Sequence, residues 1–137
     1  MNILLVEDDA LLAKGTARII ERQGQHQVQV SMDPEYIFEV CSSGAIDLII
    51  MDVNLPGAIW QGEEVTGSDL SKYLKSQPLT QKIPIIVLTA YAMRSEQNHL
   101  LQVAQADALF TKPLVDYGDL LKTIADLTVT HPPETNR

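Results

Sequence analysis

The chain has 137 residues and a formal net charge of −8, from 18 acidic and 10 basic side chains. This length suits one domain that can bury a core without disulfides. The 45% of hydrophobic residues favours a packed body over disorder. The acidic excess argues against general nucleic-acid binding, which depends on Lys and Arg to neutralise phosphates. With Cys41 as the single cysteine, no internal disulfide can form.

Neither a membrane span nor a targeting segment is predicted. No apolar run approaches the roughly 20 residues that cross a bilayer. The N-terminus lacks the basic segment and long apolar stretch that are typical of a signal peptide. We therefore expect a cytoplasmic protein that makes no membrane contact.

In the first part of the chain, short apolar runs alternate with stretches of helical periodicity. A strand is predicted over 3–6, a helix from Leu12 that stops at Gly24, and a second strand over 28–30. Asp33-Pro34 has the composition of a helix cap and first turn. The run over 46–51 is almost wholly apolar, which predicts a strand covered on both faces.

The second part opens with a polar, glycine-containing stretch over 54–66. The remaining pattern predicts, in chain order, a helix with Leu70, Tyr73 and Leu74 inward, a strand over 83–88, a helix with Leu100, Leu101 and Val103, a strand over 108–111 and a last amphipathic helix over 117–127. One domain over 1–127 and a flexible tail over 128–137 are expected.

Five successive strand–helix units predict an α/β fold, a mainly parallel sheet with helices on both faces. Right-handed crossovers restrict the topologies that such a chain can adopt. In sheets of this kind, ligands bind at the carboxyl ends of the strands. The residues that follow each predicted strand are therefore the candidate site.

Polar side chains with complementary charges follow four of the strands: Glu7-Asp8-Asp9, Asp52, Thr89 and Lys112. Two carboxylates about 4 Å apart repel by about 4 kcal/mol at an effective dielectric constant near 20. Lys112 offsets part of this repulsion, and a hard divalent cation offsets more. Oxygen ligands with room for water suit Mg²⁺.

Such a site has the groups that phosphoryl transfer requires. Asp52 can attack phosphorus as a nucleophile, because carboxylates form acyl phosphates. Lys112 can pair with one phosphate oxygen, and Thr89 can donate a hydrogen bond to another. Positioning and charge neutralisation supply most of the catalysis in this class of reaction.

Four motifs resemble those of two-component response regulator receiver domains: Leu4-Leu5-Val6-Glu7-Asp8-Asp9, Met51-Asp52-Val53-Asn54-Leu55-Pro56, Leu88-Thr89-Ala90 and Thr111-Lys112-Pro113. Each is weak alone, but their order, each after a predicted strand, is specific, and the resemblance covers roughly residues 1–127. It implies a flavodoxin-like (βα)5 doubly wound parallel sheet with strand order 2-1-3-4-5. It also implies Mg²⁺-dependent phosphorylation by a sensor histidine kinase or a phosphotransfer protein.

By position, the resemblance makes Asp52 the phosphoacceptor, with Thr89 and Lys112 in contact with the phosphoryl group. The family would catalyse only its own phosphorylation and dephosphorylation, and a cis peptide bond is expected before Pro113. Asn54 would contribute its backbone carbonyl to the metal. The metal ligands implied are Glu7, Asp8, Asp52 and Asn54.

The chain departs from the family pattern in a long loop after Pro56. The residues over 57–64 form an insertion near the candidate site, and they include Trp60, the single tryptophan, and Glu63-Glu64. One interpretation is a surface excursion with Trp60 packed onto the body. The other is a partner contact or a lid, since loops beside sites often carry recognition.

A second departure is Leu109, where the family usually has Tyr or Phe. In the family this ring follows the threonine hydroxyl when the domain is phosphorylated. Phe110 is not expected to replace this ring, because neighbouring strand residues point to opposite faces. We hypothesise a muted switch, with Tyr91 taking a share, which amide exchange around the following helix would test.

Three alternatives stay open at the level of sequence. The first is a signalling receiver whose output is contact with an unknown protein and which binds no nucleic acid. A homodimer is compatible with this family. A phosphatase of the haloacid dehalogenase type needs a general acid at the position of Asn54, which cannot act as one. A pseudo-receiver that binds partners without phosphorylation is favoured by Leu109 but opposed by the complete pocket.

Overall fold

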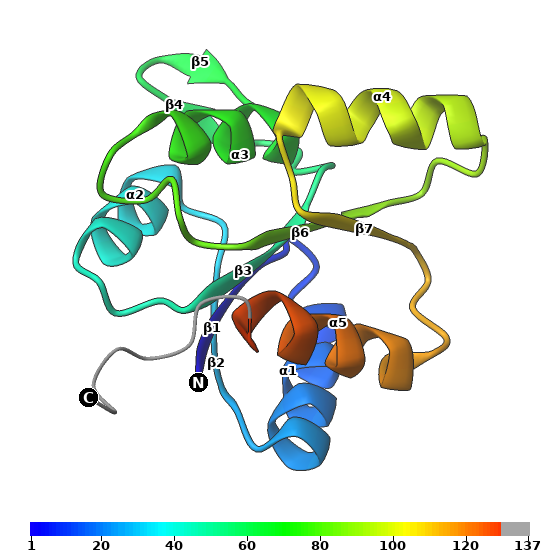
Figure 1. Cartoon of the computed structure of the whole chain (residues 1–137). Coiled ribbons are helices and arrows are strands. Elements are labelled where there is room, and N and C mark those ends of the chain that lie inside the picture. Colours follow the sequence, from blue (N-terminus) through cyan, green and yellow to red (C-terminus); the bar gives the residue numbers. More distant parts are fainter. Residues whose placement is uncertain (130–137) are drawn as a thin grey trace.

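The computed structural model describes residues 1–129 and places a parallel sheet between two layers of helices (Figure 1). The sheet has the order β2-β1-β3-β6-β7. Counted along the chain among these five strands, this is the predicted order 2-1-3-4-5, so the predicted fold is confirmed. The strands are β1 (Asn2–Val6), β2 (Gln27–Ser31), β3 (Leu48–Asp52), β6 (Ile85–Thr89) and β7 (Ala108–Thr111).

The helices divide between the two faces of the sheet, as right-handed crossovers require (Figure 1). One face carries α1 (Ala10–Gly24) and α5 (Tyr117–Val129), and the other carries α2 (Pro34–Ser42), α3 (Gly67–Ser76) and α4 (Arg94–Ala104). Each face has its own core. Adjacent residues Leu4 and Leu5 of β1 belong to different cores, because successive side chains of a strand point to opposite faces.

Side-chain caps start four of the helices, including α5, where Asp116 accepts a hydrogen bond from the Asp119 N–H. Asp9 accepts a hydrogen bond from the Leu12 N–H and caps α1, and Asp33 caps α2 in front of Pro34, as predicted. In α3, Thr66 and Asp69 form a reciprocal capping box. Asp9 thus has the role that is usual for an acid at a helix start.

Two strands begin later than the sequence predicts. The start of β3 is at Leu48, since the Asp47 N–H and carboxylate are both bonded to the backbone of Asn2. The start of β6 is at Ile85, because Pro84 has no N–H to donate to a ladder. The predicted helix with Leu100, Leu101 and Val103 is α4, in which Leu100 is buried and Val103 is 37% exposed.

The last helix, α5, continues to Val129, two residues beyond its predicted end. The rest of the predicted tail, over 130–137, lies outside the described residues. Among residues 1–129, no helix has the length and apolar character needed to cross a membrane.

The insertion over 57–64 folds as an antiparallel hairpin of β4 (Ile59–Trp60) and β5 (Glu63–Glu64). Gln61 and Gly62 link the strands with positive φ angles of 54° and 83°, the conformation of a type I′ turn. The hairpin lies beside α3 (Figure 1). Strands of two residues are too short to show a periodic pattern, which is why the sequence did not predict them.

The ring of Trp60 packs against the helices under the hairpin. It lies edge-on to Phe38 of α2 at a centroid distance of 4.3 Å, and Phe38 lies 4.7 Å from Tyr73 of α3. The interpretation that packs Trp60 onto the body is confirmed. Tyr73 is 40% exposed, so it is not inward as predicted, and it forms the outer side of this aromatic cluster.

Trp60→Ala should lower the free energy of unfolding by about 2–3 kcal/mol, because a partly buried ring loses its area and its aromatic contacts. Urea denaturation measures this. Ile59→Ala, at a neighbour that is 50% exposed, serves as the control and should cost less than about 0.5 kcal/mol. Equal losses would mean that the aromatic cluster adds no stability.

Candidate functional site

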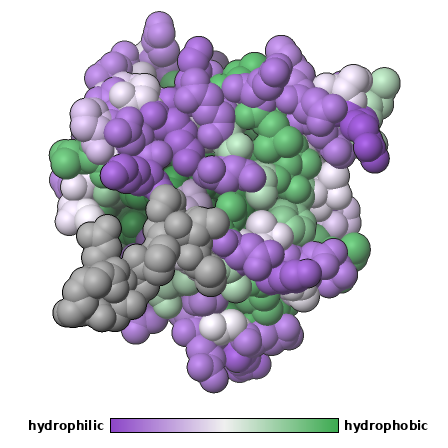
Figure 2. Space-filling view, viewed as in Figure 1, coloured by the Kyte–Doolittle hydropathy of each residue, from purple (hydrophilic) through white to green (hydrophobic). Residues whose placement is uncertain are grey.

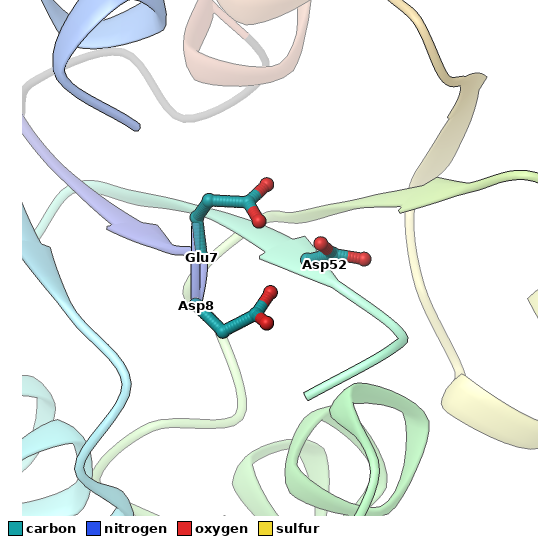
Figure 3. Close-up of side chains that lie close together, drawn as sticks. All are labelled: Glu7, Asp8 and Asp52. Carbon is teal, nitrogen blue, oxygen red and sulfur yellow. The ribbon is translucent and has the colours of Figure 1, made fainter. Parts of the chain in front are cut away.

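Three carboxylates meet at the carboxyl edge of the sheet. Glu7 and Asp8 directly follow β1, and Asp52 is the last residue of the adjacent strand β3. Figure 3 shows their side chains directed toward a common space. One oxygen from each carboxylate lies within 4.8 Å of the others. Strand pairing thus brings together residues that are distant in sequence.

Lys112 enters the same cluster from the end of β7. Its Nζ lies 2.7 Å from Asp52 Oδ2 and 3.2 Å from Glu7 Oε1. Its backbone N–H donates to the Thr89 carbonyl at 2.8 Å, which anchors the segment that carries it. The peptide bond before Pro113 is cis, as expected. One cation therefore stands among three carboxylates, and the cluster keeps an excess of negative charge.

Burial and crowding shift the acid–base behaviour of the cluster. The pKa of Glu7 is raised to about 7, mainly by burial; the hydrogen bond and charge of Asp52 also raise it, whereas the hydrogen bonds from the Asp9 N–H and Lys112 act to lower it. For Lys112, burial lowers the pKa, but Asp52 and Glu7 outweigh this effect and the pKa is raised. An oxygen cluster that holds a proton near neutrality fits a divalent cation, because the cation would replace that proton.

Thr89 and Asn54 border the carboxylates. Thr89 ends β6 and is 1% exposed, and its Oγ1 accepts the Tyr91 N–H at 3.1 Å. The Asn54 N–H donates to Asp52 Oδ1 at 3.1 Å. The Asp52 carboxylate is therefore held on one oxygen by Asn54 and on the other by Lys112.

Gly67 supports the site from the start of α3, a role that the sequence does not predict. Its N–H donates to the Val53 carbonyl at 2.9 Å. A Cβ at this position would overlap the main-chain carbonyl oxygen of Asp52 and approach Val53 Cα to 2.8 Å. The first turn of α3 therefore contacts the backbone that carries Asp52. Only the glycine itself, at the start of a capped helix, gives a signal of this in the sequence.

The position usually taken by an aromatic switch residue is partly buried against the core. Leu109 packs with the cluster under α2, α3 and α4, and Phe110 packs with the cluster under α1 and α5. The prediction that Phe110 points to the other face is confirmed. Tyr91 is 50% exposed, and its carbonyl accepts a hydrogen bond from Gln97. Along β7, hydrophobic side chains reach the surface between α4 and α5 (Figure 2).

Cys41 is fully buried in α2, and burial raises the pKa of its thiol to about 12. It is a small hydrophobic core residue, as predicted, and is not a reactive thiol.

Comparison with known proteins identifies the family. Residues 3–125 match the model of the response regulator receiver domain. The polar-differentiation response regulator DivK of Brucella ovis is 29% identical over 113 residues, which cover 82% of this chain and 85% of DivK.

Two solved structures share the fold closely. The signal receiver domain of a signal transduction histidine kinase from Syntrophus aciditrophicus is 29% identical, with a TM-score of 0.78 and coverage of 97% and 95% of the two chains. A CheY-like response regulator receiver domain protein from Methanospirillum hungatei JF-1 is 26% identical, with a TM-score of 0.74 and 94% coverage of both chains. The chain belongs to the response regulator receiver domains of two-component signalling.

Proposed function

We propose that this receiver domain accepts a phosphoryl group on Asp52 in an Mg²⁺-dependent reaction. The donor is a sensor histidine kinase or a phosphotransfer protein, and the output is contact with another protein. The observation that carries the proposal is the cluster of Glu7, Asp8 and Asp52, with Lys112 at 2.7 Å from Asp52. A phosphoacceptor needs a positioned carboxylate, a cation and metal ligands, and all three are supported by this geometry.

In the proposed reaction, an oxygen of Asp52 bonds to phosphorus. The P–N bond of the donor phosphohistidine breaks, and its electron pair stays on the imidazole. The hydrogen bonds from Asn54 and Lys112 orient the carboxylate before the attack. Lys112 pairs with a phosphoryl oxygen as charge moves onto it. Because Thr89 Oγ1 only accepts from Tyr91, its own proton is available for another phosphoryl oxygen.

The proposed metal ligands are Glu7, Asp8, Asp52 and the backbone carbonyl of Asn54. An all-oxygen donor set suits Mg²⁺ better than a metal that prefers nitrogen or sulfur ligands. When bound, the ion would neutralise negative charge on the phosphoryl group.

We infer that the chain acts only on itself and is not an enzyme with a separate substrate. A phosphatase mechanism would need a proton donor two residues after Asp52, and Asn54 does not provide one. Leu109 supports the pseudo-receiver alternative, whereas the complete set of Glu7, Asp8, Asp52 and Lys112 supports phosphorylation.

Intact-mass spectrometry after incubation with acetyl phosphate tests the proposal. We expect one added phosphoryl group that appears with Mg²⁺, is absent when EDTA is present, and is lost under mild alkali, as acyl phosphates are. A protein that gives no adduct and also fails to bind beryllofluoride would be a binding-only module instead.

The raised pKa of Glu7 predicts that Mg²⁺ binds more weakly in acid. Because the pKa is about 7, Glu7 holds a proton below pH 7, and the ion must displace it. The apparent affinity should therefore rise about tenfold between pH 6 and pH 8. Calorimetric titration measures this, and Glu7→Gln should bind more weakly with a flat profile over this range. A flat profile in the wild type would show that Glu7 does not take part.

A further inference from the structure

A pocket with a volume of about 270 Å³ opens between the first turns of α1 and the segment that joins β7 to α5. Helices α1 and α5 cover the same face of the sheet (Figure 1). The inner wall of the pocket is formed by Leu5 and Leu88, which are 1% and 2% exposed, and the outer wall by Leu12 and Leu114. Four leucines therefore give the pocket an apolar body, which is the usual character of a small-molecule site.

Two hydroxyl groups lie within this apolar lining. Thr16 is 4% exposed, and its Oγ1 lies 3.3 Å from the hydroxyl of Tyr117, which also lines the pocket. Within such a pair only one hydroxyl can donate to the other. Among residues 1–129, neither hydroxyl has a second hydrogen-bond partner. One hydroxyl proton and unused lone pairs therefore remain for a ligand.

The charged groups that line the pocket are already paired. Lys112 and Glu7 both contribute to its wall, and Lys112 Nζ donates to Glu7 Oε1 at 3.2 Å and to Asp52 Oδ2 at 2.7 Å. A ligand with a charge of its own would lose its hydration without gaining an unpaired counter-ion. The pocket therefore favours uncharged molecules.

The volume of the pocket limits the size of its ligand. A cavity of about 150 Å³ that is lined by apolar side chains holds benzene, so about 270 Å³ leaves room for one ring with a short polar arm. A hydroxyl on that arm can both donate to and accept from the pair of Thr16 and Tyr117. The ring would lie against the leucines and would lose apolar surface that water otherwise covers.

We propose that this pocket binds a small uncharged molecule with one apolar ring and one hydroxyl group. Its hydroxyl would bond to Thr16 and Tyr117, and its ring would lie among the four leucines. Since Lys112 lines the pocket, the ligand would contact the residue that pairs with Asp52. Binding itself needs neither Mg²⁺ nor a phosphoryl donor, so it can be tested apart from the proposed phosphorylation.

The probe is benzyl alcohol, which is titrated into ¹⁵N-labelled protein in EDTA without a phosphoryl donor. We expect amide shifts centred on Thr16 and Tyr117 and a dissociation constant of about 1 mM, because about eight heavy atoms give a limited binding free energy. Benzylammonium and benzoate keep the ring but carry a charge, and they should bind at least about tenfold more weakly. Absence of shifts up to about 10 mM, or equal affinities for the three probes, would overturn the proposal.

Two variants with the same chemical change locate the ligand. Leu12→Trp places a larger ring at the mouth of the pocket, where Leu12 is 41% exposed, and should abolish binding. Leu11→Trp acts at a neighbour that is 82% exposed and does not line the pocket, and it should preserve binding. Circular dichroism checks that both variants fold. The same affinity in the two variants, whether lost or kept, would contradict this location.

The double variant Thr16→Val/Tyr117→Phe removes both hydroxyls and keeps the shape of the lining. The affinity for benzyl alcohol relative to that for toluene should fall about fivefold, since the alcohol loses hydrogen bonds that toluene never makes. The ratio of the two affinities cancels any general effect of the substitutions on the pocket. An unchanged ratio would show that the hydroxyl pair does not hold the ligand, and the proposal would fail.

Discussion

Asp52→Asn is expected to reduce phosphoryl incorporation from acetyl phosphate by at least about a hundredfold. An amide has no anionic oxygen to attack phosphorus, whereas the shape of the side chain is unchanged. Its remaining oxygen can still accept the hydrogen bond from Lys112 or from Asn54. The variant therefore removes the nucleophile and leaves the surrounding geometry in place. Intact-mass spectrometry at equal Mg²⁺ and equal time measures the difference.

Asp126→Asn is the matched control, because it makes the same chemical change at an exposed position of α5. It should incorporate phosphate like the wild type. Asp52→Asn should also unfold at a urea concentration no lower than that of the wild type, since it removes one of three mutually repelling carboxylates. An adduct of full size in Asp52→Asn would contradict the assignment, and peptide mapping would then show whether Asp8 accepts the group.

The order of the elements could be predicted because each gives a local signal. The apolar run at β3, the Asp33-Pro34 start of α2 and the polar residues after the strands are all visible in short windows of sequence. Parallel strand order then follows from crossover handedness. Because ligands in such sheets bind at the carboxyl ends of the strands, Asp52 and Lys112 could be grouped before any distance was known.

What could not be predicted depends on contacts between distant segments. The aromatic cluster joins Phe38, Trp60 and Tyr73 from three elements, and no spacing in the sequence indicates that they meet. The shift in the pKa of Glu7 arises from burial and from Asp52, so it requires coordinates.

Gly67→Ala should be among the most damaging single-methyl changes in this chain. The added Cβ would overlap the Asp52 carbonyl oxygen and crowd Val53, and both contacts are to main-chain atoms that cannot rotate away. Either α3 moves outward or the end of β3 shifts, and both changes disturb the core. We expect a loss of about 3 kcal/mol of unfolding free energy. Phosphoryl incorporation should also fall at least about tenfold, since the Asp52 carboxylate would be displaced.

Gly15→Ala gives the opposite expectation for the same chemical change. Gly15 is exposed within α1, and its added Cβ would meet nothing within 4 Å. Alanine should therefore stabilise the protein by about 0.5–1 kcal/mol through its helix propensity, with phosphoryl incorporation unchanged. Urea denaturation of both variants compares the signs directly. If Gly67→Ala were as stable and as readily phosphorylated as the wild type, α3 would not be packed against the phosphoacceptor backbone, and the support of Asp52 would have to come from Lys112 and Asn54 alone.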